Sequence, residues 1–335
     1  MYETYYGFTG LPFQLTPDAR FFYGSGGHRR AIAHLTFGLA QGEGFILLTG
    51  EVGAGKTLLI ERLLSQIDRG TYSVAHINTT QVSGDDLFQL TLAGFGVNDA
   101  TATKATLLLR FEEALHDHRV AGRRCLLIVD EAQNLSLAAL EELRMLSNLV
   151  ESGQPSLQTI LMGQPQFRRM LASSELEQLR QRVLSSYHLG PLTRTETRAY
   201  IEHRLTTVGW HGDNPTWQDT AYAAVYDNTG GIPRRINRLC GRMLVYGVLE
   251  QSNTITGTMV GSAAEELAED LEGVPPERAP EPSHDLSEPP EERTREIAEL
   301  RSRIEALEEQ MAGREQMFRR LIDMFGASGG STGKS

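Results

Sequence analysis

Residues 46–57 read Ile46-Leu47-Leu48-Thr49-Gly50-Glu51-Val52-Gly53-Ala54-Gly55-Lys56-Thr57. The short apolar run at the start predicts a buried strand, and it leads directly into the pattern G-x-x-x-x-G-K-T. Apolar residues at helical spacing follow, namely Leu58, Leu59, Leu63 and Leu64. Strand, glycine-rich loop and helix stand in the order that this phosphate-binding pattern requires.

The glycine-rich loop has the groups that hold a polyphosphate. Its glycines let backbone N–H groups surround an anion, and the helix N-terminus adds partial positive charge. We expect Lys56 to reach the β and γ phosphates and the Thr57 hydroxyl to coordinate Mg²⁺. A glycine-rich turn before an ordinary helix is the alternative, but the complete pattern favours a nucleoside triphosphate site. The predicted nucleotide-binding residues are Gly50, Glu51, Val52, Gly53, Ala54, Gly55, Lys56, Thr57 and Leu58.

A second apolar run, residues 125–129, ends in the carboxylates Asp130 and Glu131. Such a run is typical of a parallel strand that helices cover on both faces, and ligands bind at the carboxyl ends of these strands. We expect Asp130 to hold the magnesium shell and Glu131 to orient and polarise the attacking water. Two acids after a strand usually form a solvated loop. Together with the phosphate loop they indicate a Walker B element, and Glu131 argues for hydrolysis.

Length and composition fit a chain of more than one unit. With 335 residues, of which 40% are hydrophobic, it can hold one sizeable α/β domain and one or two smaller units. The net charge of −11 arises in residues 265–309, which carry 16 acids and 5 arginines. The first 264 residues are close to neutral, so the total charge neither implies nor excludes a nucleic-acid partner.

The same composition suggests a reducing compartment. Cys125 and Cys240 fall in apolar segments, which predicts buried free thiols rather than a metal site or a disulfide. A signal peptide is not apparent, and no run of about 18 apolar residues predicts a membrane span. We therefore expect a soluble, cytoplasmic protein.

Apolar periodicity predicts five strands that alternate with helices. The expected strands are 44–49, 72–78, 125–129, 157–162 and 185–189, and the expected helices are 28–41, 56–67, 84–94, 103–120, 136–151 and one from Pro165. This alternation predicts a parallel sheet with both faces covered. From residue 193 to 271 only helical periodicity is found, without a strand. Helices near 193–208, 216–228, 233–250 and 258–271 predict a small bundle.

Shifts in composition predict six segments. Residues 1–27 form an aromatic lead-in, 28–192 the nucleotide-binding domain and 193–271 the helical domain. Residues 272–292 are acidic and proline-rich, which predicts a linker. Apolar spacing in 293–325 predicts a coiled-coil helix, and 326–335 a flexible tail. An amphipathic helix that folds back on the body, or a marginal isolated one, is the alternative for 293–325.

With the phosphate loop, the Walker B element and a helical domain placed, the chain resembles the AAA+ ATPases, which combine a P-loop NTPase sheet with an all-helical lid. Within that class it is similar to the ExeA-type (general secretion pathway protein A) family. The resemblance covers residues 1 to about 270. The residues that carry it are Tyr6-Gly7-Phe8, Pro12-Phe13, the stretch 16–23, the stretch 41–45, Asp130-Glu131-Ala132-Gln133-Asn134-Leu135, Gly163-Gln164-Pro165 and the stretch 230–237.

The resemblance implies further site residues. Gln164 would be a polar sensor that faces the γ phosphate, with a surface turn as the alternative. Arg180 or Arg182 would be an arginine finger, worth roughly 10³–10⁵ in rate, that reaches the nucleotide of a neighbouring subunit. The alternative is that both arginines pair with the acids at 175 and 177.

The helical lid and the lead-in also receive roles from the resemblance. Arg234 would occupy the sensor-2 position, with Arg235 as its rival. Residues 21–28 would help to close the base pocket. The implied cofactors are ATP and Mg²⁺, and the implied state is a homo-oligomer.

We expect an oligomeric, ATP-driven switch that acts on a protein partner through the coiled coil. Two other functions are considered as alternatives. The first is a DNA-binding regulator similar to transposition target-selection ATPases. Its candidate phosphate contacts are Arg119, Arg123, Arg124, Arg234, Arg235, Arg238 and Arg242. The second is a non-hydrolysing scaffold, against which Glu131 argues. Members of the secretion family commonly continue into a membrane span and a cell-wall-binding region, whereas this chain has an acidic linker and a heptad helix.

Overall fold

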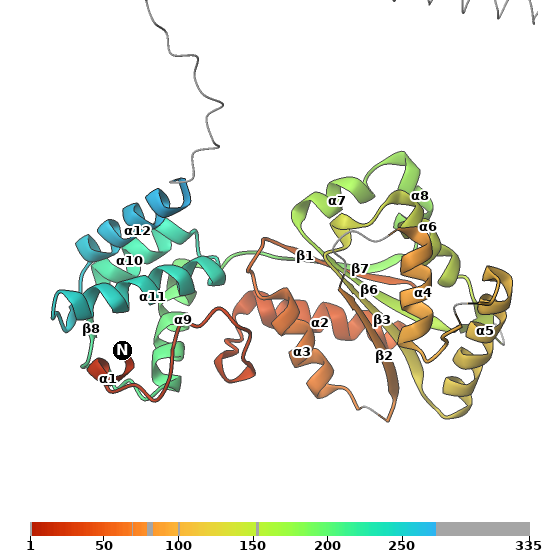
Figure 1. Ribbon diagram of the computed structural model, residues 1–335, viewed down its shortest axis with the longest axis horizontal. Coiled ribbons are helices and arrows are strands. Elements are labelled where there is room, and N and C mark those ends of the chain that lie inside the picture. Colours follow the sequence, from red (N-terminus) through yellow and green to blue (C-terminus); the bar gives the residue numbers. More distant parts are fainter. Residues whose placement is uncertain (1, 69, 79–82, 100, 152–153, 273–335) are drawn as a thin grey trace, which may run out of the picture. The chain divides into compact units, whose positions relative to one another are not determined.

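Five parallel strands form the central sheet of the α/β domain (Figure 1). The computed structural model describes residues 2–68, 70–78, 83–99, 101–151 and 154–272. The strand order is β2-β3-β6-β1-β7, and all neighbours run parallel. The bounds are β1 (Phe45–Gly50), β2 (Tyr72–Asn78), β3 (Arg124–Asp130), β6 (Leu157–Gly163) and β7 (Val183–Leu189). The predicted sheet is confirmed, with strand ends that differ by at most two residues.

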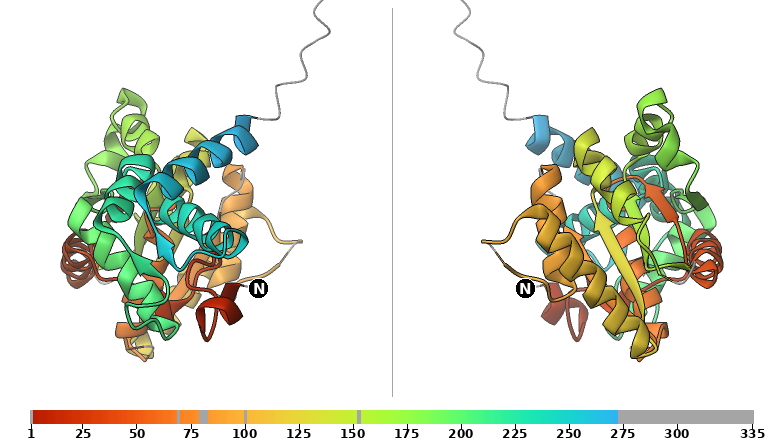
Figure 2. Two further views of the ribbon diagram at one scale, coloured as in Figure 1. Left: turned by 90° about the vertical axis from the view of Figure 1, so that its left-hand side faces the viewer. Right: turned by 90° about the vertical axis from the view of Figure 1, so that its right-hand side faces the viewer.

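Helices cover both faces of this sheet (Figures 1 and 2). Alternate residues of β1 point to opposite sides: Ile46 and Leu48 join the cluster beneath one pair of helices, whereas Phe45 and Leu47 join the other cluster. Each fully buried side chain of this size contributes roughly 1.5–3 kcal/mol. The helices of the first face are α2 (Gly26–Gln41) and α3 (Lys56–Gln66). Those of the second are α4 (Gly84–Gly94), α5 (Lys104–Val120), α6 (Leu137–Leu146), α7 (Pro165–Leu171) and α8 (Glu177–Arg180), with the short 3₁₀ turns η2 (Ala132–Asn134) and η3 (Ser174–Leu176).

Most of these helices begin with a side-chain cap, and α3 does not. A serine or threonine oxygen accepts a hydrogen bond from the first turn of α2, α4, α5 and α6. Such caps satisfy N–H groups that have no partner within the helix. The residue before α3 is Gly55, which has no side chain to offer. The N-terminus of α3 therefore keeps its N–H groups for another acceptor.

One predicted helix is shorter than expected. The helix predicted over 136–151 ends at Leu146, and the chain continues into β4 (Val150–Glu151), which pairs antiparallel with β5 (Gln154–Pro155). The polar pair Ser147 and Asn148 follows the helix, and Ser147 caps its end through its backbone N–H. Because Asn and β-branched Val have lower helix propensities than the preceding leucines, the hydrophobic spacing alone overstated the length.

Four helices form the helical lid (Figure 2, left, green to blue). They are α9 (Arg194–Thr207), α10 (Asp219–Thr229), α11 (Pro233–Leu249) and α12 (Gly257–Glu272). The prediction that this region holds no strand is wrong, because β8 (Thr216–Trp217) pairs in parallel with β9 (Thr254–Ile255). The helix expected from residue 216 accordingly begins at Asp219. A two-residue strand is too short to show a periodicity of two in the sequence.

The aromatic lead-in packs on the lid. It contains α1 (Tyr2–Tyr6) and the 3₁₀ turn η1 (Ala19–Phe21), and its buried aromatic residues belong to the same hydrophobic cluster as the lid helices. These residues are Tyr6, Phe8, Phe13 and Phe21. Helix α2 begins at Gly26, whereas the nucleotide-binding domain and its first helix were expected to begin at residue 28. The lead-in is therefore part of the lid core.

Several expectations concern other parts of the chain. The predicted linker, coiled coil and tail, from residue 273 onward, lie outside the described residues. Cys125 and Cys240 are buried free thiols, as predicted. Among the described residues, no helix is both long enough and apolar enough to cross a membrane.

Candidate nucleotide site

The phosphate loop joins β1 to α3 through glycines in left-handed conformations. Gly53 has a φ of +80° and Gly55 a φ of +97°. Glycine adopts this region without the steric penalty of a Cβ atom, so the sequence pattern has a direct structural cause. The loop leads directly into α3, so the positive end of this helix lies at the loop. No side chain caps the first N–H groups of α3. The arrangement suits the binding of a phosphate.

Lys56 lies at the start of α3 and is almost completely buried, with 6% of its surface exposed. Its Nζ donates to Gly50 O at 2.9 Å and to Glu51 O at 3.2 Å. Burial lowers the pKa of the ammonium group, while the nearby charges of Glu131, Asp130 and Glu51 oppose that shift. An ammonium group has three N–H donors, so one stays available for an anionic ligand.

Thr57, at the start of α3, lies beside Asp130, at the carboxyl end of β3. Thr57 Oγ1 donates to Asp130 Oδ2 at 3.0 Å. Hydroxyl and carboxylate oxygens are the ligands that Mg²⁺ prefers, usually together with substrate phosphates. This pair of oxygens beside the phosphate loop therefore fits a magnesium ion bound with a nucleotide.

Glu131 is held by two glutamine amides. Gln164 Nε2 donates to Glu131 Oε2 at 3.1 Å, and Gln133 Nε2 donates to the same oxygen. Gln133 Oε1 in turn accepts from the backbone N–H of Gln164 at 2.9 Å. Glu131 has a φ of +52°, which is uncommon for a residue with a side chain. Gln164 thus belongs to the carboxylate site and is not an isolated surface residue.

The lid contacts the phosphate loop through Arg234. Its backbone N–H donates to Gly53 O at 3.2 Å. A Cβ atom placed on Gly53 would lie 2.2 Å from Arg234 Cβ, so only glycine permits this approach. Arg235 is exposed and does not line the cavity beside the loop, whereas Arg234 does. Of the two rivals for the sensor-2 position, the structure brings Arg234 to the site.

Arg180 and Arg182 lie away from the phosphate loop of their own chain. Arg182 Nη1 donates to Ser147 Oγ at 3.1 Å and to Ser147 O at 3.3 Å. Arg180 Nη1 donates to Ala172 O at 3.1 Å and is exposed. Within the described part of the chain, neither arginine pairs with the acids at 175 and 177. The ion-pair alternative for these two residues is therefore not supported.

A cavity of about 400 Å³ extends from the phosphate loop to the lid. This volume lies within the usual range for small-molecule sites. Its lining joins four parts of the chain: the loop with the start of α3, Glu131 after β3, the lid helices α9 and α11, and residues 14–18 of the lead-in. The lining residues outside the loop are Gln14, Leu15, Thr16, Pro17, Asp18, Glu131, Tyr200, Arg204, Pro233, Arg234 and Asn237.

Sequence reasoning missed part of this lining. It assigned the closure of the base pocket to residues 21–28, whereas residues 14–18 of the lead-in line the cavity. From the segment 21–28, Phe21 is buried in the lid core and His28 packs beneath Gly55. Tyr200, Arg204 and Asn237 received no role. Tyr200 and Arg204 lie four residues apart on α9, but that spacing is equally typical of an ordinary helix.

Comparison with known proteins identifies the class. A family model described as an AAA domain matches residues 39–171. General secretion pathway protein A of Aeromonas hydrophila is 36% identical over 269 residues, which make up 80% of this chain and 49% of that protein. The chain has a fold of the AAA+ type. This relative confirms the resemblance to the ExeA type. The chain spans about half of the length of that relative.

Solved structures agree on the fold of this AAA+ chain. Cdc6p of Pyrobaculum aerophilum is similar over 78% of this chain and 75% of its own, with a TM-score of 0.58 and 17% identity. The ORC2 protein of Aeropyrum pernix in its ADP form is similar over 77% and 73%, with a TM-score of 0.55 and 17% identity. At this identity the likeness concerns the fold alone.

Proposed function

We propose that this AAA+ chain binds and hydrolyses ATP and acts as an oligomeric, nucleotide-dependent switch on a protein partner. One observation carries the proposal: the Glu131 carboxylate, held by Gln164, lies at the same sheet edge as Lys56 and the Thr57–Asp130 pair. These three groups are the parts that phosphoryl transfer to water requires, namely a charge clamp, a metal shell and a residue that positions the water.

Each residue has a separate role in this mechanism. The phosphate loop and Lys56 bind and orient the β and γ phosphates. Thr57 and Asp130 hold Mg²⁺, which when bound neutralises charge on the phosphates. Glu131 orients and polarises the attacking water, and Gln164 keeps the carboxylate of Glu131 in position. Arg234 lies next to Gly53 and transmits the state of the loop to the lid.

The oligomeric part of the proposal concerns Arg180 and Arg182. Both lie away from the nucleotide cavity of their own chain, so either can act only on a neighbouring copy. Arg182 is the better candidate, because its guanidinium is half-buried and held by Ser147, whereas Arg180 is exposed. A held guanidinium loses less side-chain entropy when it binds a phosphate.

ATP turnover at increasing protein concentration tests the oligomeric switch. The turnover number should rise with concentration in the wild-type chain, and Arg182→Ala should remove that rise and lower turnover by at least about tenfold. Arg168→Ala, which changes an exposed arginine of α7, is the matched control. Turnover that is independent of concentration, with Arg182→Ala equal to the wild type, would reject the finger and leave a monomeric ATPase.

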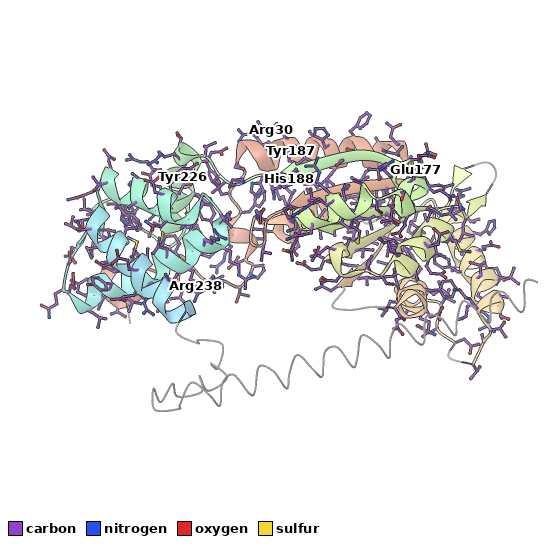
Figure 3. All side chains as sticks on the ribbon, turned by 90° about the horizontal axis from the view of Figure 1, so that it is seen from above. Arg30, Glu177, Tyr187, His188, Tyr226 and Arg238 are labelled. Carbon is purple, nitrogen blue, oxygen red and sulfur yellow. The ribbon has the colours of Figure 1, made fainter. Side chains whose placement is uncertain are left out.

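The DNA-binding alternative has less support from the basic residues of the lid. Arg234 is at the phosphate loop, and Arg242 Nη2 lies 3.6 Å from Glu266 Oε2. Arg235 and Arg238 are exposed on α11, and Figure 3 labels Arg238 there. Duplex DNA added to the turnover assay at low salt distinguishes the two functions. Stimulation that disappears at high salt would favour the regulator, and unchanged turnover would favour the switch.

The assignment of the protein partner to residues 293–325 rests on their heptad spacing. Deletion of residues 291–326 tests it by mass measurement. Loss of oligomers would mean that the predicted coiled coil drives assembly, whereas an unchanged mass distribution would leave partner docking as its function.

A further inference from the structure

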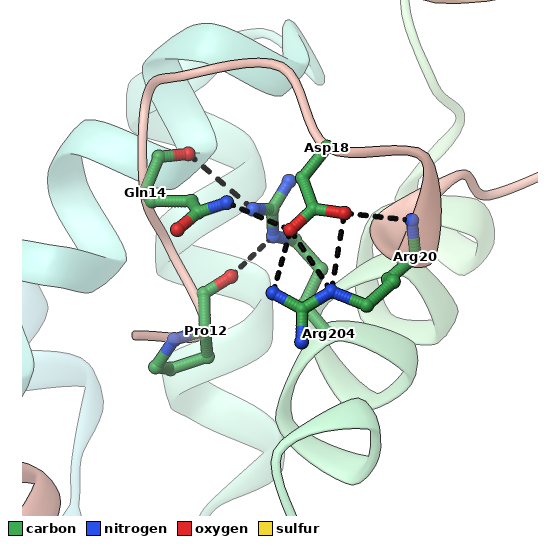
Figure 4. Close-up of polar contacts among 5 residues, drawn as sticks. All are labelled: Pro12, Gln14, Asp18, Arg20 and Arg204. Atoms are coloured by element: carbon green, nitrogen blue, oxygen red, sulfur yellow. Dashed lines mark hydrogen bonds and ion pairs between the residues drawn. The ribbon is translucent and has the colours of Figure 1, made fainter. Parts of the chain in front are cut away.

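Arg204 of α9 is a buried arginine within the nucleotide cavity (Figure 4). It is 6% exposed. Its Nε donates to Pro12 O and its Nη2 donates to Gln14 O at 3.3 Å, while its guanidinium carbon lies 4.4 Å from the centre of the Phe21 ring. Burial of a charge is costly unless its donors are satisfied. Arg204 meets that cost with lead-in carbonyl groups about 190 residues away in sequence.

The segment held by Arg204 is the strap, defined here as residues 12–18. The strap is also closed on itself, since Gln14 Nε2 donates to Asp18 Oδ2 at 3.1 Å. Arg20 Nη2 donates to the same oxygen at 2.7 Å. The strap exposes Leu15, 57% of whose surface is accessible although it lines the cavity. Arg204 therefore fixes a loop that presents an apolar side chain to whatever fills the cavity.

Arg204 also begins a chain of hydrogen bonds that runs through Tyr200 to Asn237. Its Nη1 donates to Tyr200 Oη at 3.0 Å, and Tyr200 Oη lies 2.8 Å from Asn237 Oδ1. A guanidinium has no acceptor, so the Tyr200 hydroxyl accepts from Arg204, and it donates its own hydrogen to Asn237 Oδ1. Asn237 thus accepts through Oδ1. Its Nδ2 group, for which the described residues offer no acceptor, remains as a donor.

The place of Asn237 along the cavity indicates which part of a ligand it meets. Arg234, at the start of α11, contacts the phosphate loop at Gly53. Asn237 lies three residues further along the same helix, a displacement of about 4.5 Å away from the loop. It shares this end of the cavity with Tyr200, Arg204 and the strap. A triphosphate bound at Lys56 would therefore bring its nucleoside to this end.

We propose that Arg204 is a positioning residue for the nucleoside end of the cavity. It holds the strap on one side, and through Tyr200 it orients the Asn237 amide so that Nδ2 donates to an acceptor atom of the nucleoside. The inference rests on the proposed nucleotide function. It adds that Asn237 is a specificity-determining residue and that the relay Arg204–Tyr200–Asn237 fixes its orientation. The nucleoside, and not the phosphates, is the part of the ligand that depends on the relay.

Calorimetric titration of the full chain with MgATP and with magnesium tripolyphosphate tests this inference, because the second ligand has no nucleoside. Arg204→Lys keeps the charge but loses the forked donors, and should weaken ATP binding by at least about tenfold. Tyr200→Phe removes one hydroxyl and should weaken it by about fivefold. Tripolyphosphate affinity should stay within about twofold in both. Arg198→Lys and Tyr222→Phe, at lid positions that do not line the cavity, are the matched controls and should change neither affinity.

A double-mutant cycle separates a relay from independent packing effects. Tyr200→Phe and Asn237→Ala should each weaken ATP binding, and the double variant should be no weaker than Asn237→Ala alone, because both remove the same oriented donor. Thermal unfolding shows whether each variant is folded. If Arg204→Lys does not fold, the conservative Tyr200→Phe variant and the cycle decide the question.

The outcomes distinguish the inference from the function on which it rests. A wild-type chain that binds neither ligand would reject the nucleotide function itself. A wild-type chain that binds both, with variants that weaken both ligands equally or neither, would overturn the inference alone. Additive losses in the cycle would also overturn it, because they would mean that Tyr200 does not act through Asn237.

Discussion

Gln164 Nε2 donates a hydrogen bond of 3.1 Å to Glu131 Oε2, which joins the end of β6 to the end of β3. These strands are neighbours in the sheet, although their last residues are more than 30 positions apart in the sequence. A carboxylate held in this way has lost the rotational freedom that a water-positioning group would otherwise lose in the transition state. The relationship ties the sensor position to the residue proposed to direct the water.

Replacement of Gln164 by Leu should lower the rate of hydrolysis without loss of binding. The Glu131 carboxylate loses one of its two amide donors, so we expect kcat to fall by at least about tenfold while KM changes by less than about threefold. Steady-state ATP hydrolysis measures both constants. Gln166→Leu, an exposed position of α7, is the matched control. A rise in KM with unchanged kcat would instead mean that Gln164 binds the nucleotide and does not position Glu131.

Replacement of Lys56 by Ala should abolish nucleotide binding. The buried ammonium group is the positive charge that the loop sequence itself carries, so its loss should raise the dissociation constant for MgATP by at least about 100-fold, or ~2.7 kcal/mol. The matched control is Lys104→Ala, since Lys104 is exposed and pairs with Glu142 and Asp85. Calorimetric titration measures both variants. Wild-type affinity in Lys56→Ala would place the phosphates elsewhere.

Replacement of Gly53 by Ala should disturb the contact between loop and lid. Both Gly53 and Gly122 have positive φ, of +80° and +74°, so an alanine at either position costs roughly 1–2 kcal/mol in backbone strain. Only at Gly53 would the new Cβ meet another residue, Arg234, at 2.2 Å; at Gly122 it would meet nothing within 4 Å. Denaturant unfolding should therefore show a greater loss for Gly53→Ala than for Gly122→Ala. Equal losses would contradict the close approach of Arg234.

The stability of the chain should fall as the pH falls below about 6.5, in part because of His28. Burial lowers the pKa of His28, and the charge of Glu196 only partly opposes this shift. The unfolded chain therefore binds a proton near pH 6.5, whereas the folded chain keeps His28 neutral until a lower pH. The free energy of unfolding must then decrease with falling pH, by at most about 1.4 kcal/mol per pH unit for this residue.

Denaturant unfolding of His28→Asn at pH 7.5 and pH 5.5 measures that contribution. The variant should lose less stability than the wild type between the two values, whereas His211→Asn, an exposed position, should lose as much as the wild type. The burial of His118 and His203 also lowers their pKa values, so the variant should keep part of the pH dependence. Parallel losses in His28→Asn and the wild type would contradict the prediction.

The parts of the fold that follow from local sequence were predicted well. The strands β1 and β3 are each built on a continuous apolar run, and the phosphate loop is set by glycines whose positive φ no other residue adopts as readily. In a parallel sheet the carboxyl ends of the strands lie on the same side, so Asp130 at the end of β3 and Thr57 after β1 come close together. The main elements of the site could for this reason be inferred before any coordinates.

The remaining features depend on contacts between distant residues. Arg204 has the spacing of the buried face of α9, but only the fold shows that carbonyl groups of the strap accept from its guanidinium. The hydrogen bond from Gln164 to Glu131 likewise requires two strand ends to be adjacent. The two-residue pair of β8 and β9 is held by the lid around it, because an isolated pair of this length has almost no stability of its own. Contacts between residues that are far apart in the sequence cannot be inferred from a local sequence pattern.

The most direct test of the central claim is ATP turnover by Glu131→Gln, measured with MgATP affinity on the same preparation. The substitution keeps the size of the side chain and removes the charge that polarises water. We predict that affinity stays within about threefold of the wild type while kcat falls by at least about 100-fold, the range in which general-base groups contribute. Wild-type turnover in this variant would contradict the account, because the water would then be positioned by another group.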